Sequence, residues 1–349
     1  MLSGPTADVD ERPQAWQREL AGALSGLGEL LTYVGLSRGR LAEVPQLAEQ
    51  AAAEFPVRVP RTFADRIRKG DPSDPLLLQV LATGLETDAE PGFTDDPLRE
   101  IEASPIPGLL AKYTGRVLVI ATSACAVHCR YCFRRHFPYH DMLLTERHAE
   151  EVAAYVQNHP SVHEVILSGG DPLSLSDSKL RSLVRCFASI THLRRLRIHS
   201  RLPIVIPARV TDELIALLAD LQLQPVIVLH CNHPNELDGT VRQAVLKFRS
   251  SGILLLNQSV LLRGVNDSVE TLAALSERLV SFGVMPYYLH TLDRVRGASH
   301  FDIPRSRALS ILESMSATLP GYLVPRFVTE EPDRPAKTPL VSDTVLVAF

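Results

Sequence analysis

The chain has 349 residues, 45% of them hydrophobic and 22% charged, with a formal net charge of −4 at pH 7. This length suits one large domain or two modest ones, and the charge offers no basic surface for nucleic acid. No apolar run near ~18 residues predicts a membrane span, and five cysteines without a signal-peptide pattern indicate a cytoplasmic protein rather than a secreted disulfide scaffold.

The first 110 residues predict a mostly helical lead-in that covers the core. Apolar residues recur at helical spacing from Trp16 to about Val34, and a further helix is expected around Leu47–Phe55. Thr62 is a candidate N-cap of a short helix. Residues 85–107 carry many acids and prolines and are predicted to be irregular.

Short β-branched segments then alternate with amphipathic helical windows. Thr145, Ser176, Thr211 and Ser268 each precede such a window with an acid in the first turn, and they are candidate N-caps. Strands are predicted at 116–121, 164–167, 196–199, 225–229, 253–256 and 284–289, and helices at 145–158, 176–190, 211–221, 239–251, 268–282 and 304–318.

This alternation predicts an α/β fold with a parallel sheet and helices outside it. Six strands are too few for a full eight-stranded barrel, so we expect a partial (β/α)6 barrel, with a doubly wound sheet as the alternative. We divide the chain into a helical N-terminal region at 1–110, a barrel at 111–320 and a C-terminal segment at 321–349. Polar motifs follow the predicted strands, so chemistry is expected at the strands' C-terminal ends.

Three cysteines follow the first of these strands. Cys125, Cys129 and Cys132 have the spacing C-x3-C-x2-C, and three thiolates on a four-iron cluster would leave one iron open. This spacing resembles the signature of the radical S-adenosylmethionine (SAM) enzymes, in which the open iron binds SAM. A Cys3His zinc site, with His128 or His136 as fourth ligand, is the alternative.

Ser168-Gly169-Gly170-Asp171 follows the second strand. Taken alone, it is a strand-to-helix turn that brings backbone groups close to a neighbour. Beside a cysteine triplet, it resembles the glycine motif that contacts the methionyl amino group of SAM.

Lys337 precedes Thr338 and Pro339 near the C-terminus. A lysine beside a turn is usually a solvated surface residue. A lysine can also form a Schiff base when its surroundings keep its amine neutral.

The order of the motifs resembles that of the lysine 2,3-aminomutases, from about Lys112 to Pro339. The matching features include the cysteine triplet, the glycine motif, Gln258–Asp267 and the Lys-Thr-Pro end. Two features depart from the family pattern: Glu330 stands where the family has an aspartate, and the glycine run before the lysine is missing. The other segments that carry the resemblance are Arg134, His233-Pro-Asn-Glu, Pro286-Tyr-Tyr, Asp293 and His300-Phe301.

The resemblance implies a role for each matching residue. The three cysteines would hold a [4Fe–4S] cluster, Ser168–Asp171 would lie at SAM, and Lys337 would carry pyridoxal 5′-phosphate (PLP). Arg134 would bind the substrate carboxylate, and Asp293 with Glu330 would bind its distal ammonium group. The PLP phosphate would be bound by Arg116 and Gln258, with Lys112 and Arg209 near it.

The implied reaction converts L-α-lysine to β-lysine by 1,2-amino migration, through a 5′-deoxyadenosyl radical and a PLP aldimine. The compact form of the chain resembles the subgroup that supplies β-lysine to the ligase that modifies elongation factor P. A reductant such as flavodoxin or ferredoxin is implied, and an oligomer is compatible with the family. The alternatives are a free-lysine catabolic enzyme, a radical SAM enzyme without PLP, and a zinc-binding protein without catalysis.

Overall fold

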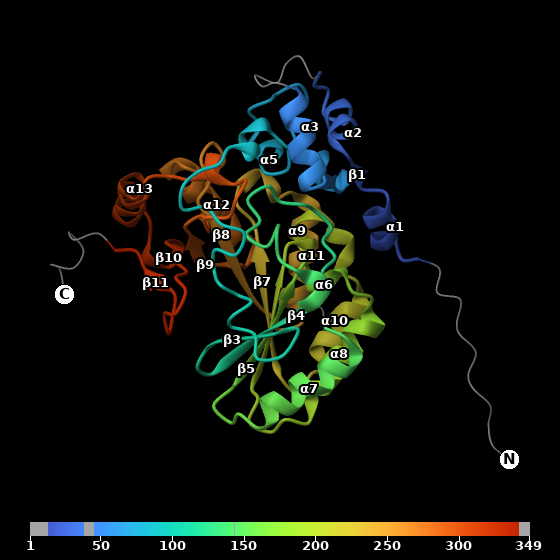
Figure 1. Ribbon diagram of the computed structural model, residues 1–349. Helices are drawn as coiled ribbons and strands as arrows, with labels where there is room; N and C mark the ends of the chain where they lie inside the picture. Colours follow the sequence, from blue (N-terminus) through green and yellow to red (C-terminus); the bar gives the residue numbers. More distant parts are fainter. Residues whose placement is uncertain (1–12, 38–44, 143, 342–349) are drawn as a thin grey trace.

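The computed structural model describes residues 13–37, 45–142 and 144–341. A sheet with the strand order β11-β10-β9-β8-β7-β6-β5-β4-β3 forms its centre, and helices cover the outside (Figure 1). The strands are β3 (Leu109–Tyr113), β4 (Arg116–Thr122), β5 (Glu164–Gly169), β6 (Arg195–Ser200), β7 (Gln224–His230), β8 (Leu254–Val260), β9 (Met285–His290), β10 (Arg326–Thr329) and β11 (Thr338–Pro339).

The six predicted strands, β4 to β9, are parallel and adjacent in sequence order. No reversal of strand order occurs among them, so the partial barrel is confirmed and the doubly wound alternative is wrong. Three short strands extend the predicted sheet. β3 pairs antiparallel with β4, β10 pairs parallel with β9, and β11 returns antiparallel to β10.

The helices outside the barrel begin where the sequence predicts. The side chains of Thr145, Ser176, Thr211 and Ser268 each accept a hydrogen bond from a backbone N–H in the first turn. None of the described helices is long and apolar enough to cross a membrane. The barrel helices are α6 (Tyr139–Met142), α7 (Glu146–Gln157), α8 (Asp177–Ala188), α9 (Leu202–Val205), α10 (Asp212–Ala219), α11 (Gly239–Ser250), α12 (Val269–Phe282) and α13 (Arg305–Thr318).

The N-terminal region differs from the prediction at two places. The expected helix from Trp16 to Val34 is two helices, because Gly26 has φ 101° and the segment before it pairs as a strand. Thr62 lies inside a helix that begins after Pro60 and caps nothing. The elements are α1 (Ala15–Ala21), β1 (Leu24–Ser25), α2 (Leu27–Tyr33), α3 (Pro45–Glu54), β2 (Arg58–Val59), α4 (Arg61–Ala64), α5 (Pro75–Leu78) and the 3₁₀ helix η2 (Gly84–Thr87).

One hydrophobic core joins the N-terminal region to the barrel. Trp16 and Phe63 belong to the same buried cluster as Phe187 and Phe248 of the barrel helices. The N-terminal elements lie at one end of the barrel (Figure 1). They therefore cover the core, as expected, whereas the boundaries at 110 and 320 stay predictions and residues 342–349 lie outside the described residues.

Candidate active site

The cysteine loop leaves the C-terminal end of β4 and is held from both sides. Arg201, just after β6, donates a hydrogen bond from Nη1 to Cys129 Sγ at 2.7 Å. From the N-terminal region, the Glu86 carboxylate accepts hydrogen bonds from Arg130 at 2.6 and 2.8 Å and from Arg135 at 2.7 Å. All of these side chains except that of Cys129 are buried. The loop that carries the three thiols is therefore fixed by buried charged contacts.

The three thiols influence one another electrostatically. Burial raises the pKa of Cys132 to about 11, and the neighbouring Cys129 adds to this shift. Burial likewise raises the pKa of Cys125, with Cys132 and Cys129 contributing. Because three adjacent thiolates repel one another, a cationic iron cluster is the kind of group that would hold them deprotonated. The donor set therefore fits a [4Fe–4S] cluster.

The two candidate fourth ligands of the alternative zinc site, His128 and His136, are engaged elsewhere. His128 Nδ1 lies 2.7 Å from the Pro56 carbonyl oxygen, and His136 Nε2 lies 3.2 Å from that of Arg296. Across residues 13–37, 45–142 and 144–341, no three His, Cys, Asp or Glu side chains converge as a single ion requires. Neither histidine is therefore poised to complete a Cys3His site.

The glycine motif packs directly against the start of the cysteine loop. Gly170 N–H donates to the Thr122 carbonyl at 2.7 Å, and Asp171 N–H donates to that of Ala124 at 2.8 Å. A Cβ atom on Gly170 would lie 2.4 Å from the Ala124 oxygen. Only glycine allows this approach, so the motif positions the backbone that leads into Cys125.

We predict that Gly170→Ala displaces the cysteine loop and lowers the iron and sulfide bound after anaerobic reconstitution by about half or more, because the contact is with backbone. Gly239→Ala is the matched control, since a Cβ atom there meets nothing within 4 Å. Chemical analysis of iron and sulfide measures the effect. Full iron occupancy in Gly170→Ala would contradict this account of the motif.

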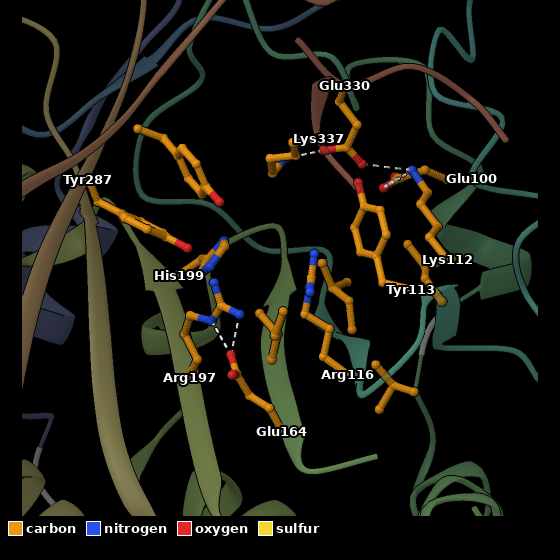
Figure 2. Close-up of a pocket in the computed structure, with 15 residues that line it drawn as sticks. Glu100, Lys112, Tyr113, Arg116, Glu164, Arg197, His199, Tyr287, Glu330 and Lys337 are labelled. Carbon is orange, nitrogen blue, oxygen red and sulfur yellow. Dashed lines mark hydrogen bonds and ion pairs between the residues drawn. The ribbon is translucent and has the colours of Figure 1, made fainter. Parts of the chain in front are cut away.

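Lys337 lines a cavity of about 260 Å³ inside the barrel (Figure 2). It lies in the β10–β11 hairpin, immediately before β11, whereas Glu330 directly follows β10. Its side chain is 20% exposed, so it does not point into bulk water. The charged residues of the lining are four cations, Lys112, Arg116, Arg197 and Lys337, and three acids, Glu100, Glu164 and Glu330.

A row of buried and half-buried charges connects this cavity to the cysteine loop. Lys337 Nζ forms an ion pair with Glu330, and Lys112 Nζ lies 3.4 Å from both Glu330 and Glu100. Glu100 in turn accepts hydrogen bonds from Arg134, two residues after Cys132, at 2.6 and 2.9 Å. The two groups that the sequence places far apart are thus joined through one continuous network.

The carboxylates near Lys337 have opposite pKa shifts. Burial alone would raise the pKa of Glu330, but the ammonium groups of Lys337 and Lys112 lower it to about 2. Burial raises the pKa of Asp293 to about 7, and the charge of Glu330 adds to this. Asp293 and Glu330 share a second cavity of about 600 Å³. Asp293 is the acid there whose charge depends on pH near neutrality.

Comparison with known proteins matches residues 119–275 to the Radical SAM superfamily. The chain is 48% identical to the L-lysine 2,3-aminomutase of Escherichia coli K12 over 326 residues, which cover 93% of this chain and 94% of that protein. The chain belongs to the lysine 2,3-aminomutase family. The aminomutases of Haemophilus influenzae and Clostridium subterminale are 44% and 35% identical to it, over 96% and 95% of this chain and 98% and 79% of theirs.

Membership of this family settles the cofactors that the fold serves. Radical SAM enzymes use a [4Fe–4S] cluster with SAM, and lysine 2,3-aminomutases use PLP in addition. In this aminomutase, the cysteine loop fits the cluster, and the cationic cavity around Lys337 fits a phosphorylated aldehyde. The cofactor set expected from the sequence is that of the family.

The structure brings most of the expected aminomutase site residues together. Lys112, Arg116, Glu330 and Lys337 line one cavity, and Asp293 lies in the adjoining one. Ser168 accepts a hydrogen bond from Arg134 Nη1 at 3.0 Å, beside the glycine motif. Gln258 lies on β8, paired with His230 and Tyr288, and is not among the residues that line the Lys337 cavity.

Two arginines are engaged differently from the prediction. Arg209 donates to the carbonyl of Leu173 and to Asp177, at 2.7 Å each, and its guanidinium lies 4.5 Å from the centre of the Trp16 ring. It therefore supports the N-terminal helix outside the Lys337 cavity. The guanidinium group of Arg134 donates hydrogen bonds to both carboxylate oxygens of Glu100. A substrate carboxylate would therefore have to displace Glu100 to bind Arg134.

Sequence reasoning missed several side chains of the candidate site. Glu86 and Glu100 lie in the acidic stretch expected to be irregular, and Tyr113, Arg197 and His199 are inward-facing strand residues. For Tyr113, Arg197 and His199, the only signal in the sequence was their position in a strand, because every second residue of a barrel strand faces inward. The two glutamates gave no local signal, because their arginine partners lie 34 to 49 positions away.

Proposed function

We propose that this chain converts L-lysine to β-lysine by radical-mediated migration of the α-amino group to the adjacent carbon. The observation that carries the proposal is the row of buried and half-buried charges from Arg134, beside the cysteines, to Lys337. Removal of a hydrogen from an unactivated carbon lies beyond any side-chain acid or base, so a cofactor radical is needed. A site that joins three thiols to a Schiff-base lysine serves that purpose.

Three cationic side chains of the cavity have a part in this proposal. The Lys337 amine would attach PLP, and Arg116 with Lys112 would bind its phosphate. Arg116 forms no ion pair with any described acid, so its guanidinium is available to a phosphate. When bound, SAM with the cluster supplies the radical, and PLP supplies the conjugated system that lets nitrogen migrate. The surrounding barrel excludes water from the reacting carbons.

The carboxylates would recognise the distal end of lysine. Glu330 and Asp293 both face the cavity next to Lys337 and offer two negative groups to one ammonium. Glu330 is paired with Lys337 and Lys112, and its longer side chain spans to both. Arg134 would bind the α-carboxylate after exchange with Glu100. Gln258 remains a proposed phosphate contact.

Asp293 gives the reaction a predicted pH dependence. Its pKa of about 7 means that it is mostly protonated in the free protein at lower pH, and a neutral carboxyl attracts an ammonium group weakly. We expect kcat/KM for lysine to fall by about tenfold per pH unit below pH 7. Asp293→Asn should lower kcat/KM at pH 8 by about tenfold or more and flatten the acidic limb. If the pH profiles of kcat/KM for wild type and Asp293→Asn were the same, Asp293 would not bind the ammonium group of lysine.

We further propose that the β-lysine is made for the ligase that modifies elongation factor P, in the cytoplasm, with flavodoxin or ferredoxin as reductant. The support for this subgroup over lysine catabolism is the resemblance of the compact chain to it, described above from the sequence. Cells lacking the gene should lose the β-lysyl mass on elongation factor P and regain it when β-lysine is supplied. Retention of the modification in such cells would overturn the link.

The function itself is tested by anaerobic reconstitution with iron, sulfide, SAM, PLP and a reductant, followed by chiral analysis of the products from L-lysine. β-Lysine is expected only when every component is present. A protein that binds zinc, holds no sulfide and forms no β-lysine would instead be the non-catalytic binder.

A further inference from the structure

His199 is an inward-facing residue of β6 that the proposed mechanism does not use. Arg197 and His199 are two positions apart on β6, so they share the inner face of the barrel, and Arg201 follows just after the strand. Arg197 pairs with Glu164, and both line the Lys337 cavity (Figure 2). Arg201 contacts Cys129 Sγ at the other end. His199 thus stands between the Lys337 cavity and the cysteine loop.

The imidazole of His199 has no hydrogen-bond partner among the residues that the structure describes. Its Nε2 is shielded from solvent, whereas Nε2 of His230, on the next strand, lies 2.8 Å from the Tyr131 hydroxyl. A buried polar atom without a partner costs about 1–3 kcal/mol of stability. Such groups in native proteins call for an explanation, and a bound ligand is one.

The surroundings make this imidazole a neutral hydrogen-bonding group. Burial lowers its pKa well below the usual value, and the nearby Arg197 and Lys337 lower it further. A neutral ring offers one N–H donor and one bare nitrogen acceptor. The cavity that it lines has four cations against three carboxylates, and this balance favours an anionic ligand with polar atoms on its ring.

We propose that His199 hydrogen-bonds to a polar ring atom of the pyridoxal group held at Lys337, and so positions that ring toward the cysteine loop. This inference rests on the proposed function, because it requires PLP at Lys337. Three observations support it. Nε2 of His199 is buried without a hydrogen-bond partner, His199 and Lys337 line the same cavity, and His199 lies between that cavity and the cysteine loop.

The test compares PLP binding by wild type, His199→Phe and His199→Gln, without SAM or substrate. We expect His199→Phe to weaken PLP binding by about tenfold, the value of one hydrogen bond, and to shift the absorption band of the bound chromophore. His199→Gln should recover much of the affinity, because its amide restores a donor and an acceptor. The melting temperature of the PLP-free His199→Phe protein should stay level or rise, since no protein partner is lost.

His163→Phe is the matched control, because this histidine bonds a backbone carbonyl outside the cavity. Its PLP affinity and spectrum should equal those of wild type. Unchanged affinity and spectrum in His199→Phe, with a borohydride-reduced adduct on Lys337 in wild type, would overturn the role of His199 alone. Absence of that adduct in wild type would overturn both this inference and the PLP-dependent function.

Discussion

Lys337→Ala should abolish β-lysine formation, lowering turnover by about 10³-fold or more, as removal of a covalent catalytic group does. The structure holds this amine 20% exposed in a cationic cavity, paired with Glu330. The variant should still bind iron and sulfide normally, because Lys337 touches none of the cysteine loop's contacts. Product analysis by chromatography, with iron content measured on the same sample, separates the two effects.

Lys247→Ala is the control for this result. Lys247 forms an exposed pair with Asp212 on the outside of the barrel, and such pairs contribute about 0–1 kcal/mol. The activity and stability of the Lys247→Ala variant should match those of wild type. Turnover of Lys337→Ala within tenfold of wild type would mean that the amine has no covalent role.

Glu86→Gln should destabilise the protein by about 3–5 kcal/mol and loosen the cysteine loop. The carboxylate is buried and neutralises the guanidinium groups of Arg130 and Arg135, which flank Cys132. A neutral amide leaves two buried cations without their counter-charge, which costs much more than loss of an exposed pair. Denaturant unfolding measures the stability, and the rate of iron loss to a chelator measures how firmly the loop holds the cluster.

Glu102→Gln is the matched substitution on the surface. Glu102 pairs with Arg99 and its side chain is 63% exposed, so the same chemical change should have little effect there. If Glu86→Gln unfolded at the wild-type denaturant midpoint and released iron at the wild-type rate, the N-terminal region would not be holding the loop.

The barrel was predictable because its signals are local. The parallel strands are short segments rich in apolar residues, and four of the helices between them, α7, α8, α10 and α12, begin at a hydroxyl side chain that the structure shows capping the first turn. The cysteine spacing and the Lys-Thr-Pro end likewise predicted the family that the comparisons confirm. In these segments, neighbouring residues alone determine the pattern.

The N-terminal region and the charged network were less predictable, because their partners are remote. The break at Gly26 depends on pairing of Leu24–Ser25 with a strand 34 residues away, which overrides a helical pattern. Glu100 meets Arg134, and Glu330 meets Lys112, across 34 and 218 positions. Arg209 was expected near the phosphate, and its bonding to Leu173 and Asp177 instead depends on how the helices pack.

The cysteine loop and Lys337 are expected to serve one shared site. Transfer of hydrogen from SAM to the product tests this most directly. The reconstituted protein is given L-lysine and SAM deuterated at the 5′ carbon, and the β-lysine formed is examined by mass spectrometry. If a radical generated at the cysteines reaches lysine held at Lys337, deuterium passes from SAM into β-lysine. β-Lysine free of deuterium, or deuterium confined to 5′-deoxyadenosine, would contradict a shared site.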